Sequence, residues 1–148
     1  MELAVRPATV ADATEIARLE AAVFSSPWSP DAVLSHISSA YGCALVATRR
    51  GDVIGYLLGF LLPDEGELLR IAVLPSQRSS GVGSSIMHSF LDILEKRGTP
   101  SCFLEVRKSN TAAQALYRAF GFSPVGTRPR YYQNPTEDAL LMARRPVQ

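Results

Sequence analysis

Apolar and polar positions repeat with two different periods along the chain, and the order of these periods predicts an α/β fold. Alternating or continuously apolar runs predict strands over residues 3–6, 44–48, 53–62, 67–73 and 102–106. Apolar residues at helical spacing predict helices over 9–23, from 30 onward, 83–97 and 110–120. Two further strands, over 122–126 and 138–143 and joined by a long polar loop, are expected to end the fold.

Local signals and element order refine this picture. Thr9 with Asp12 three residues on is expected to cap the first helix, and Ser29 before Pro30 starts the second. In that second helix, Leu34 and Ile37 are expected to face the core. The strand, loop, helix and strand over residues 67–106 predict a right-handed crossover between parallel strands. We therefore expect a mixed, mostly antiparallel sheet flanked by about four helices.

Length, composition and charge narrow the class of protein. The 148 residues suit one domain over 1–148, and 47% hydrophobic with 20% charged residues is typical of a globular chain. A net charge of +1 supplies no global field for direct binding of nucleic acid. Cys43 and Cys102 are expected to be free buried thiols. With no signal-peptide pattern and no apolar run long enough to cross a membrane, we expect a cytoplasmic protein without a membrane partner.

The segment between Ile71 and Ser84 is typical of a buried strand that runs through a glycine loop into a helix. Free backbone N–H groups at a helix start attract an anion, Gly81 and Gly83 permit close approach, and Arg78 adds a positive charge. The Gly-Lys-Ser/Thr of a P-loop is absent, and Ile86 stands where a dinucleotide motif has its third glycine. A simple tight turn remains the alternative interpretation.

Two blocks of sequence resemble a known family. Arg78-x-x-Gly81-x-Gly83 resembles the acetyl-CoA loop of the GNAT acyltransferase superfamily. The remaining matches, which span nearly the whole chain, resemble its RimI-type branch of bacterial N-terminal acetyltransferases acting on a small-subunit ribosomal protein. They are Leu104-Glu105-Val106-Arg107, Ser109-Asn110, Leu116-Tyr117, Gly121-Phe122, Pro27-Trp28-Ser29 and Arg130-Tyr131-Tyr132. The resemblance implies a GNAT fold whose sheet is splayed between two central parallel strands, with acetyl-CoA as co-substrate and no metal.

The same resemblance assigns roles to individual residues. It implies that Glu105 accepts a proton from the attacking amine and that Tyr117, a phenol still protonated at neutral pH, returns a proton to the leaving CoA sulfur. The expected cofactor-binding residues are Ile71, Ala72, Val73, Arg78, Ser79, Ser80, Gly81, Val82, Gly83, Ser84 and Asn110. The expected substrate-binding residues at the peptide entrance are Trp28, Arg130, Tyr131 and Tyr132.

Simpler interpretations stay open for several of these residues. Glu105 could merely pair with Arg107 or another base, and Glu67 is a rival general base because many GNAT enzymes carry their base at its position. Tyr117 could be a core aromatic, and Asn110 could be only a helix cap, a role compatible with cofactor binding. The aromatic residues of the entrance could likewise be structural.

The implied substrate is the N-terminal alanine of a small-subunit ribosomal protein, bound by a monomer or weak dimer. A GNAT enzyme for another amine, such as a lysine side chain or a small polyamine, is the enzymatic alternative, and a non-catalytic acetyl-CoA-binding module is the other. The chain departs from the family pattern at Ser26, where an aromatic residue is common, and at Ser79-Ser80, which leaves Arg78 as the one cation of the cofactor loop.

Overall fold

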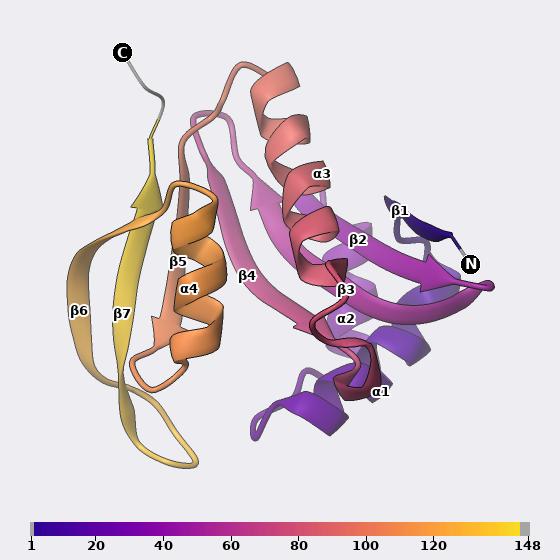
Figure 1. Ribbon diagram of the computed structural model, residues 1–148, viewed down its shortest axis with the longest axis horizontal. Coiled ribbons are helices and arrows are strands. Elements are labelled where there is room, and N and C mark those ends of the chain that lie inside the picture. Colours follow the sequence, from indigo (N-terminus) through magenta and orange to yellow (C-terminus); the bar gives the residue numbers. More distant parts are fainter. Residues whose placement is uncertain (1, 146–148) are drawn as a thin grey trace.

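The computed structural model describes residues 2–145, which form a central sheet with helices on both faces (Figure 1). Within these residues the sheet has seven strands in the order β1-β2-β3-β4-β5-β7-β6. The strands are β1 (Leu3–Pro7), β2 (Gly42–Arg49), β3 (Asp52–Leu61), β4 (Gly66–Val73), β5 (Cys102–Arg107), β6 (Ser123–Tyr132) and β7 (Glu137–Arg144). The helices are α1 (Ala13–Val23), α2 (Pro30–Ser38), α3 (Val82–Lys96) and α4 (Thr111–Ala119), with short 3₁₀ turns η1 (Val10–Asp12) and η2 (Pro75–Gln77).

Two apolar clusters cover the two faces of the sheet. Neighbouring residues of β3 point to opposite faces, so Leu57 packs under α3 and α4 while Tyr56 and Leu58 pack under α1 and α2. Ile86 and Phe90 of α3 are fully buried, as the apolar stripe of this helix predicts. Figure 1 shows the same division, with α3 and α4 in front of the sheet and α1 and α2 behind it.

The sheet splits between its two central strands. β4 and β5 are parallel but pair only over three positions, the last of which joins Leu68 to Leu104. Leu69 has no partner on β3, because the register steps from Leu68 to Arg70 there. Such a bulge bends a strand away from its neighbour. Beyond it, β4 follows β3 and β5 follows β7, so the predicted splay is confirmed, and each strand presents an unpaired edge to the gap.

The C-terminal hairpin corrects one prediction. β6 runs to Tyr132 rather than ending near residue 126, so the expected long polar loop is a short turn before Glu137. Irregular register between Pro124 and Gly126, and again between Arg128 and Tyr132, interrupts its pairing with β7. Each interruption shifts the alternation of side chains. Apolar and polar residues therefore do not alternate along the full length of β6, which is why the sequence pattern predicts too short a strand.

Helix α2 corrects another prediction. Leu34 is 39% exposed, whereas Val33 and His36 are buried and Ile37 is half-buried. Residues 33, 36 and 37 fit the helical period as well as 34 and 37 do, so periodicity alone does not choose the inner face. The choice is made by contact, because the His36 ring packs edge-on against Phe60 with centroids 4.9 Å apart.

Thr9 and Asp12 form the expected capping pair, but they cap the 3₁₀ turn η1 that leads into α1 rather than α1 itself. The Asp12 carboxylate accepts the Thr9 N–H at 2.8 Å and pairs with both terminal nitrogens of Arg6 at 2.8 and 3.1 Å. The hydrogen bonds from Arg6 hold the pKa of Asp12 below its usual range. Replacing Asp12 by alanine is expected to lower the free energy of unfolding by about 1 kcal/mol at neutral pH.

The pH dependence of that loss follows from the lowered pKa. A carboxyl group of this kind stabilises the fold above its unfolded pKa of about 3.9 and loses the effect as the pH falls through its folded pKa. Urea unfolding of Asp12→Ala and the native protein should therefore differ at neutral pH and converge in strong acid. Glu15→Ala, which removes an exposed carboxylate from the next turn, is the control. An equal difference at both pH values would contradict this explanation.

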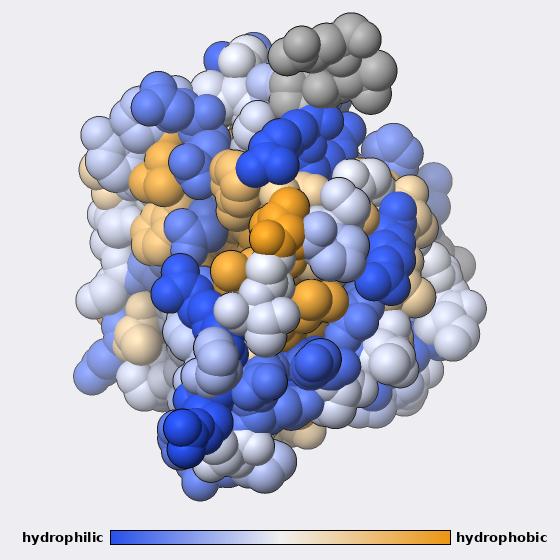
Figure 2. Space-filling model, turned by 90° about the vertical axis from the view of Figure 1, so that its left-hand side faces the viewer, coloured by the Kyte–Doolittle hydropathy of each residue, from blue (hydrophilic) through white to orange (hydrophobic). Residues whose placement is uncertain are grey.

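Strand β6 forms one edge of the sheet. Nearly all of its residues are exposed, and Pro124, Arg128, Pro129 and Arg130 lie along it. Proline and charge both hinder the addition of another strand. Figure 2, which views the molecule from this side, shows a limited apolar area framed by hydrophilic side chains.

Three further expectations concern the two cysteines, membrane-spanning helices and metal ligands. Cys43 and Cys102 are free and buried, as predicted, and burial raises the pKa of Cys43 to about 11 and that of Cys102 to about 12. Neither is therefore a reactive thiolate near neutral pH. Across residues 2–145, every helix is too short or too polar to traverse a membrane. The same residues hold no cluster of three or more His, Cys, Asp or Glu side chains suited to a metal ion.

Candidate active site

The start of α3 forms one side of the candidate site. Gly81 lies at the N-cap with φ +83°, a left-handed conformation that suits glycine. The first bond of this helix runs from the Ser85 N–H to the Gly81 carbonyl, so the N–H groups of Val82, Gly83 and Ser84 have no partner within the helix. These donors and the positive end of a fifteen-residue helix favour an anion at this point.

The unpaired edge of β4 forms the next part. The Leu74 N–H donates to Ile54 of β3, and successive residues of a strand point their N–H groups to alternate sides. The N–H groups of Ile71 and Val73 therefore face the gap toward β5, and that of Ala72 faces β3. Ala72 also buries its side chain under α1 and α2. Of the three residues expected to offer backbone donors to the co-substrate, Ile71 and Val73 are placed to do so.

The loop between β4 and α3 is held by its own side chains. The Arg78 Nε donates to the Val73 carbonyl at 3.2 Å, which draws the arginine across the end of β4. The Ser80 hydroxyl donates to the Gln77 carbonyl at 2.6 Å, and Ser79 has φ +65°. Serine at these two positions is therefore compatible with a folded loop.

Glu105 lies on β5 just beyond the paired region and faces the side of the sheet that carries α1 and α2. Its side chain is 26% exposed. The Nε of Arg128 is 3.3 Å from Oε2, yet this buried oxygen accepts no hydrogen bond from residues 2–145. The base that pairs with Glu105 is therefore Arg128 and not Arg107, because Arg107 binds Glu137 instead. Glu105 thus keeps a buried acceptor free beside the gap.

Glu67 lies next to Glu105 on the adjacent strand. Both line a hollow of about 260 Å³, together with Phe103, Leu104, Val125, Arg128, Leu141 and Met142. Burial, followed by the negative charge of Glu105, raises the pKa of Glu67. Two neighbouring carboxylates resist being charged together and attract a cation such as an ammonium group. The structure brings both candidate bases to one hollow.

Tyr117 lies on the other face of the sheet. It is 5% exposed and packs with Cys102, Leu104 and Val106, which alternate with Glu105 along β5. Its ring also contacts Phe122 at a centroid distance of 6.0 Å. Burial raises the pKa of the Tyr117 hydroxyl, so the phenol stays protonated at neutral pH. The base and acid candidates therefore flank β5 on opposite faces.

Asn110 caps α4, as one of its two interpretations predicts. Its side-chain oxygen accepts the Ala113 N–H at 3.1 Å, and its residue is exposed. The side-chain NH₂ remains on the surface at the start of the helix. A capping role leaves those two donors available, so cofactor binding remains compatible with the structure.

The tyrosines of the expected entrance lie where the β6–β7 turn folds over β5. The rings of Tyr131 and Tyr132 meet edge to face at 5.0 Å. Burial and then the charge of Glu105 raise the pKa of both hydroxyls, that of Tyr132 to about 12. Arg130 is exposed, has φ +51°, and anchors the turn through its backbone N–H to Asp138 at 2.9 Å. Tyr131 and Tyr132 therefore lie close to Glu105, whereas Arg130 contributes a hydrogen bond of its backbone N–H.

Arg107 holds this turn in place, a task that sequence reasoning did not assign to it. Its guanidinium donates to the backbone carbonyls of Gln133 and Pro135 at 2.5 and 2.8 Å and lies 4.7 Å from the Tyr132 ring centroid. It also reaches the Ser25 hydroxyl at 3.5 Å. One arginine thus joins the β6–β7 turn to the loop between α1 and α2.

Trp28 lies in that loop and is half-buried. Its ring contacts His36 edge-on at 5.5 Å, and its backbone N–H donates to the carboxylate of Glu20 at 2.9 Å. Sequence reasoning missed Glu20, which is fully buried on α1. A charged residue within the apolar stripe of a helix was the available signal.

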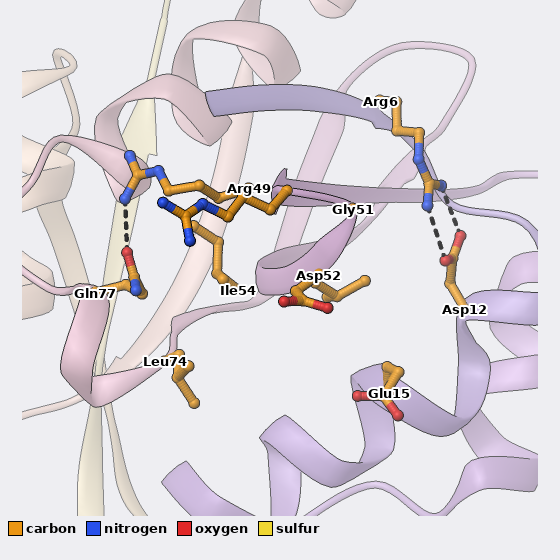
Figure 3. A pocket seen from close by; sticks show the side chains of 11 residues that line it. Arg6, Asp12, Glu15, Arg49, Gly51, Asp52, Ile54, Leu74 and Gln77 are labelled. Atoms are coloured by element: carbon orange, nitrogen blue, oxygen red, sulfur yellow. Dashed lines mark hydrogen bonds and ion pairs between the residues drawn. The ribbon is translucent and has the colours of Figure 1, made fainter. Parts of the chain in front are cut away.

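A second hollow, of about 920 Å³, lies elsewhere, between the β2–β3 turn, η2 and the start of α1 (Figure 3). Among its polar side chains Arg6 binds Asp12 and Arg49 binds Gln77, as the dashed lines show. Arg49 donates to Gln77 at 2.6 Å and so braces the segment before the α3 loop. This hollow contains neither of the candidate bases.

The sheet splits between two parallel strands, a helix begins at the end of one of them, and the other carries a carboxylate beside the gap. Together these features define a class of acyl-transferring enzyme. Residues 13–122 match the family model described as Acetyltransferase (GNAT) family, and the chain belongs to this family. The expected fold class and acetyl-CoA-dependent N-acetyltransferase class are confirmed.

Named relatives make the comparison more specific. The N-alpha-acetyltransferase RimI of Mycobacterium tuberculosis is 39% identical over 142 residues, 92% of this chain and 88% of that protein. The [ribosomal protein bS18]-alanine N-acetyltransferase of Escherichia coli K12 is 35% identical over 127 residues, 84% and 85% of the two chains. The crystal structure of the Escherichia coli ribosomal-protein-S18-alanine N-acetyltransferase matches with a TM-score of 0.90 at 30% identity, covering 97% of this chain and 93% of that one. The resemblance to the RimI-type branch is confirmed.

Proposed function

We propose that this enzyme transfers acetyl from acetyl-CoA to the N-terminal alanine of a small-subunit ribosomal protein, the bS18 protein named for its relatives. The observation that carries the choice of a chain end is the contact of Arg107 with both Ser25 and the Gln133 carbonyl. Through this contact the α1–α2 loop and the β6–β7 turn are joined at one end of the site. A peptide terminus needs access from one direction only, whereas a lysine within a chain needs room for peptide on both sides.

The chemistry begins with the amine. An α-ammonium group with a pKa of about 7.7–8.0 loses its proton far more readily than lysine, at about 10.4. We assign Glu105 to accept that proton, directly or through a water, because its buried Oε2 lacks a hydrogen-bond donor among residues 2–145. Glu67, on the same hollow, raises the negative potential that draws the ammonium group in.

The freed amine nitrogen then attacks the thioester carbon, forming a C–N bond and moving an electron pair onto the carbonyl oxygen. The N–H groups of Ile71 and Val73 face the gap and would stabilise that oxyanion. When the C–S bond breaks, the carbonyl re-forms and Tyr117 donates its proton to the sulfur. The attacking nitrogen, positively charged after the attack, releases its second proton, which restores the Tyr117 phenol directly or through solvent. A phenol is protonated at neutral pH and can therefore supply this proton.

The residues present fit acetyl-CoA. The free N–H groups of Val82, Gly83 and Ser84 suit its diphosphate, and Arg78 adds the cation of the loop. Asn110 has donors left for the carbonyls of the pantetheine arm. In this proposal Trp28, Tyr131 and Tyr132 line the peptide entrance, and Arg130 lies at its rim. We place the enzyme in the cytoplasm as a monomer or weak dimer, without direct contact to nucleic acid.

The experiment compares two sets of peptides with the purified enzyme and acetyl-CoA. One set begins with alanine and carries the first residues of bS18, and the other is blocked at its N-terminus and carries lysine. Mass spectrometry should find acetyl on the α-amine of the first set only. Labelling of the blocked set alone would favour the lysine alternative. Calorimetric binding of acetyl-CoA without turnover on any peptide would favour a non-catalytic module.

A further inference from the structure

The α1–α2 loop, residues 24–29, is fastened by side chains on three elements, α1, β4 and β5. Arg70 of β4 donates to the Ser26 carbonyl at 2.7 Å and lies 4.2 Å from the Phe24 ring centroid. Arg107 of β5 reaches the adjacent Ser25. One arginine from each strand bordering the gap therefore contacts neighbouring residues of the loop.

Glu20 joins these contacts into one network. Its Oε1 accepts the Trp28 N–H at 2.9 Å and lies 3.4 Å from Arg70, and its Oε2 accepts the Tyr56 hydroxyl. The side chain of Glu20 is wholly inaccessible to water. These partners come from the loop, β4 and β3, so a single carboxylate ties the loop to strands β3 and β4.

A carboxylate at this position is costly for stability alone. Removing a carboxylate from water is unfavourable, and apolar residues of similar volume often fill such sites at equal or better stability. The other buried residues of α1 are all apolar: Ala13, Ile16, Ala17 and Leu19. Glu20 alone breaks the stripe, and it does so where the loop needs an acceptor for the Trp28 N–H.

We infer that Glu20 is a positioning residue: it holds the α1–α2 loop, and Trp28 with it, in the place that forms the wall of the acceptor-peptide site. The inference rests on the proposed function in one respect, the identity of the acceptor. Ser26 contributes to the network through its backbone carbonyl, which any residue supplies. The serine that stands here in place of the family's common aromatic residue therefore leaves this contact intact.

The chain offers a direct probe, because Trp28 is its only tryptophan. Glu20→Gln keeps the size and the acceptor oxygen but removes the charge that holds Arg70. Acrylamide quenching of Trp28 fluorescence is expected to rise about twofold, and the peptide KM about fivefold, while kcat and the acetyl-CoA KM change little. Glu15→Gln, on the exposed side of the same helix, is the matched control and should leave all four unchanged.

A second variant covers the case in which Glu20→Gln does not fold. Arg70 is partly exposed, so Arg70→Gln should fold and should change quenching and peptide KM in the same direction. Folded variants with native quenching and native peptide KM would overturn the inference, and so would increased quenching with an unchanged peptide KM. If the native enzyme acetylates a different amine, the proposed function is wrong but the role of Glu20 can still be tested. The KM of that amine is then measured in place of the peptide KM.

Discussion

Replacement of Glu105 by glutamine should lower kcat/KM for the acceptor peptide by about 10²–10⁴-fold, the usual effect of losing a general base. Glutamine keeps the volume and leaves the neighbouring Arg128 in place, but it cannot take a proton. The hollow beside the gap holds a second carboxylate, so the measurement needs Glu67→Gln in parallel. Initial rates across the pH range, with calorimetry of acetyl-CoA to confirm intact binding, provide the readout.

The two variants separate the two candidate bases. Glu67→Gln should keep most of the rate and raise the peptide KM modestly, since it removes a charge that attracts the ammonium group. If Glu67→Gln loses the larger factor while Glu105→Gln retains full kcat/KM at every pH, the assignment is reversed. Because the two carboxylates interact, the pH profile reports the pair rather than either residue alone.

Replacement of Tyr117 by phenylalanine should lower kcat by about 10²-fold or more, because the CoA thiolate must then leave without a positioned proton donor. The ring would still pack against Phe122 and the core, so the fold and the acetyl-CoA affinity should be retained. Single-turnover rates with saturating peptide test the chemical step itself. Since burial raises the pKa of Tyr117, the donor should remain protonated in mildly alkaline solution.

The matched control for this variant is Tyr41→Phe, which removes a hydroxyl from a half-exposed tyrosine away from the gap. It should change neither kcat nor acetyl-CoA binding. A native single-turnover rate in Tyr117→Phe would assign this tyrosine to the core alone. A loss of stability in urea equal to the loss of rate would point to the same conclusion.

Local pattern carried much of the information about fold and chemistry. The strand, glycine loop and helix over residues 67–96 follow from short-range signals, and so do the caps at Asp12, Ser29 and Asn110. Glu105 could be singled out because its motif lies in consecutive residues. Such features depend on neighbours along the chain, which a sequence displays directly.

Partnerships between distant segments needed the tertiary structure. Arg107 or another base was one possible partner of Glu105, yet Arg107 binds Glu137 and the turn before it, and Arg128 lies beside Glu105. Glu20 meets Trp28, Tyr56 and Arg70 from elements far apart in the sequence. Which of many possible partners a buried charge finds is settled by packing, because only the folded chain decides which desolvated groups face one another.

The bulges show the same limit in the backbone. The extra residue Leu69 bends β4 from β5 and opens the gap, and irregular pairing hides the length of β6. Both arise from cross-strand register, which alternation along one strand does not encode. The residue order was enough to indicate the family and its candidate reactive groups. The opposite placement of Glu105 and Tyr117, and the fastening of the α1–α2 loop, follow from strand pairing and packing across the sheet.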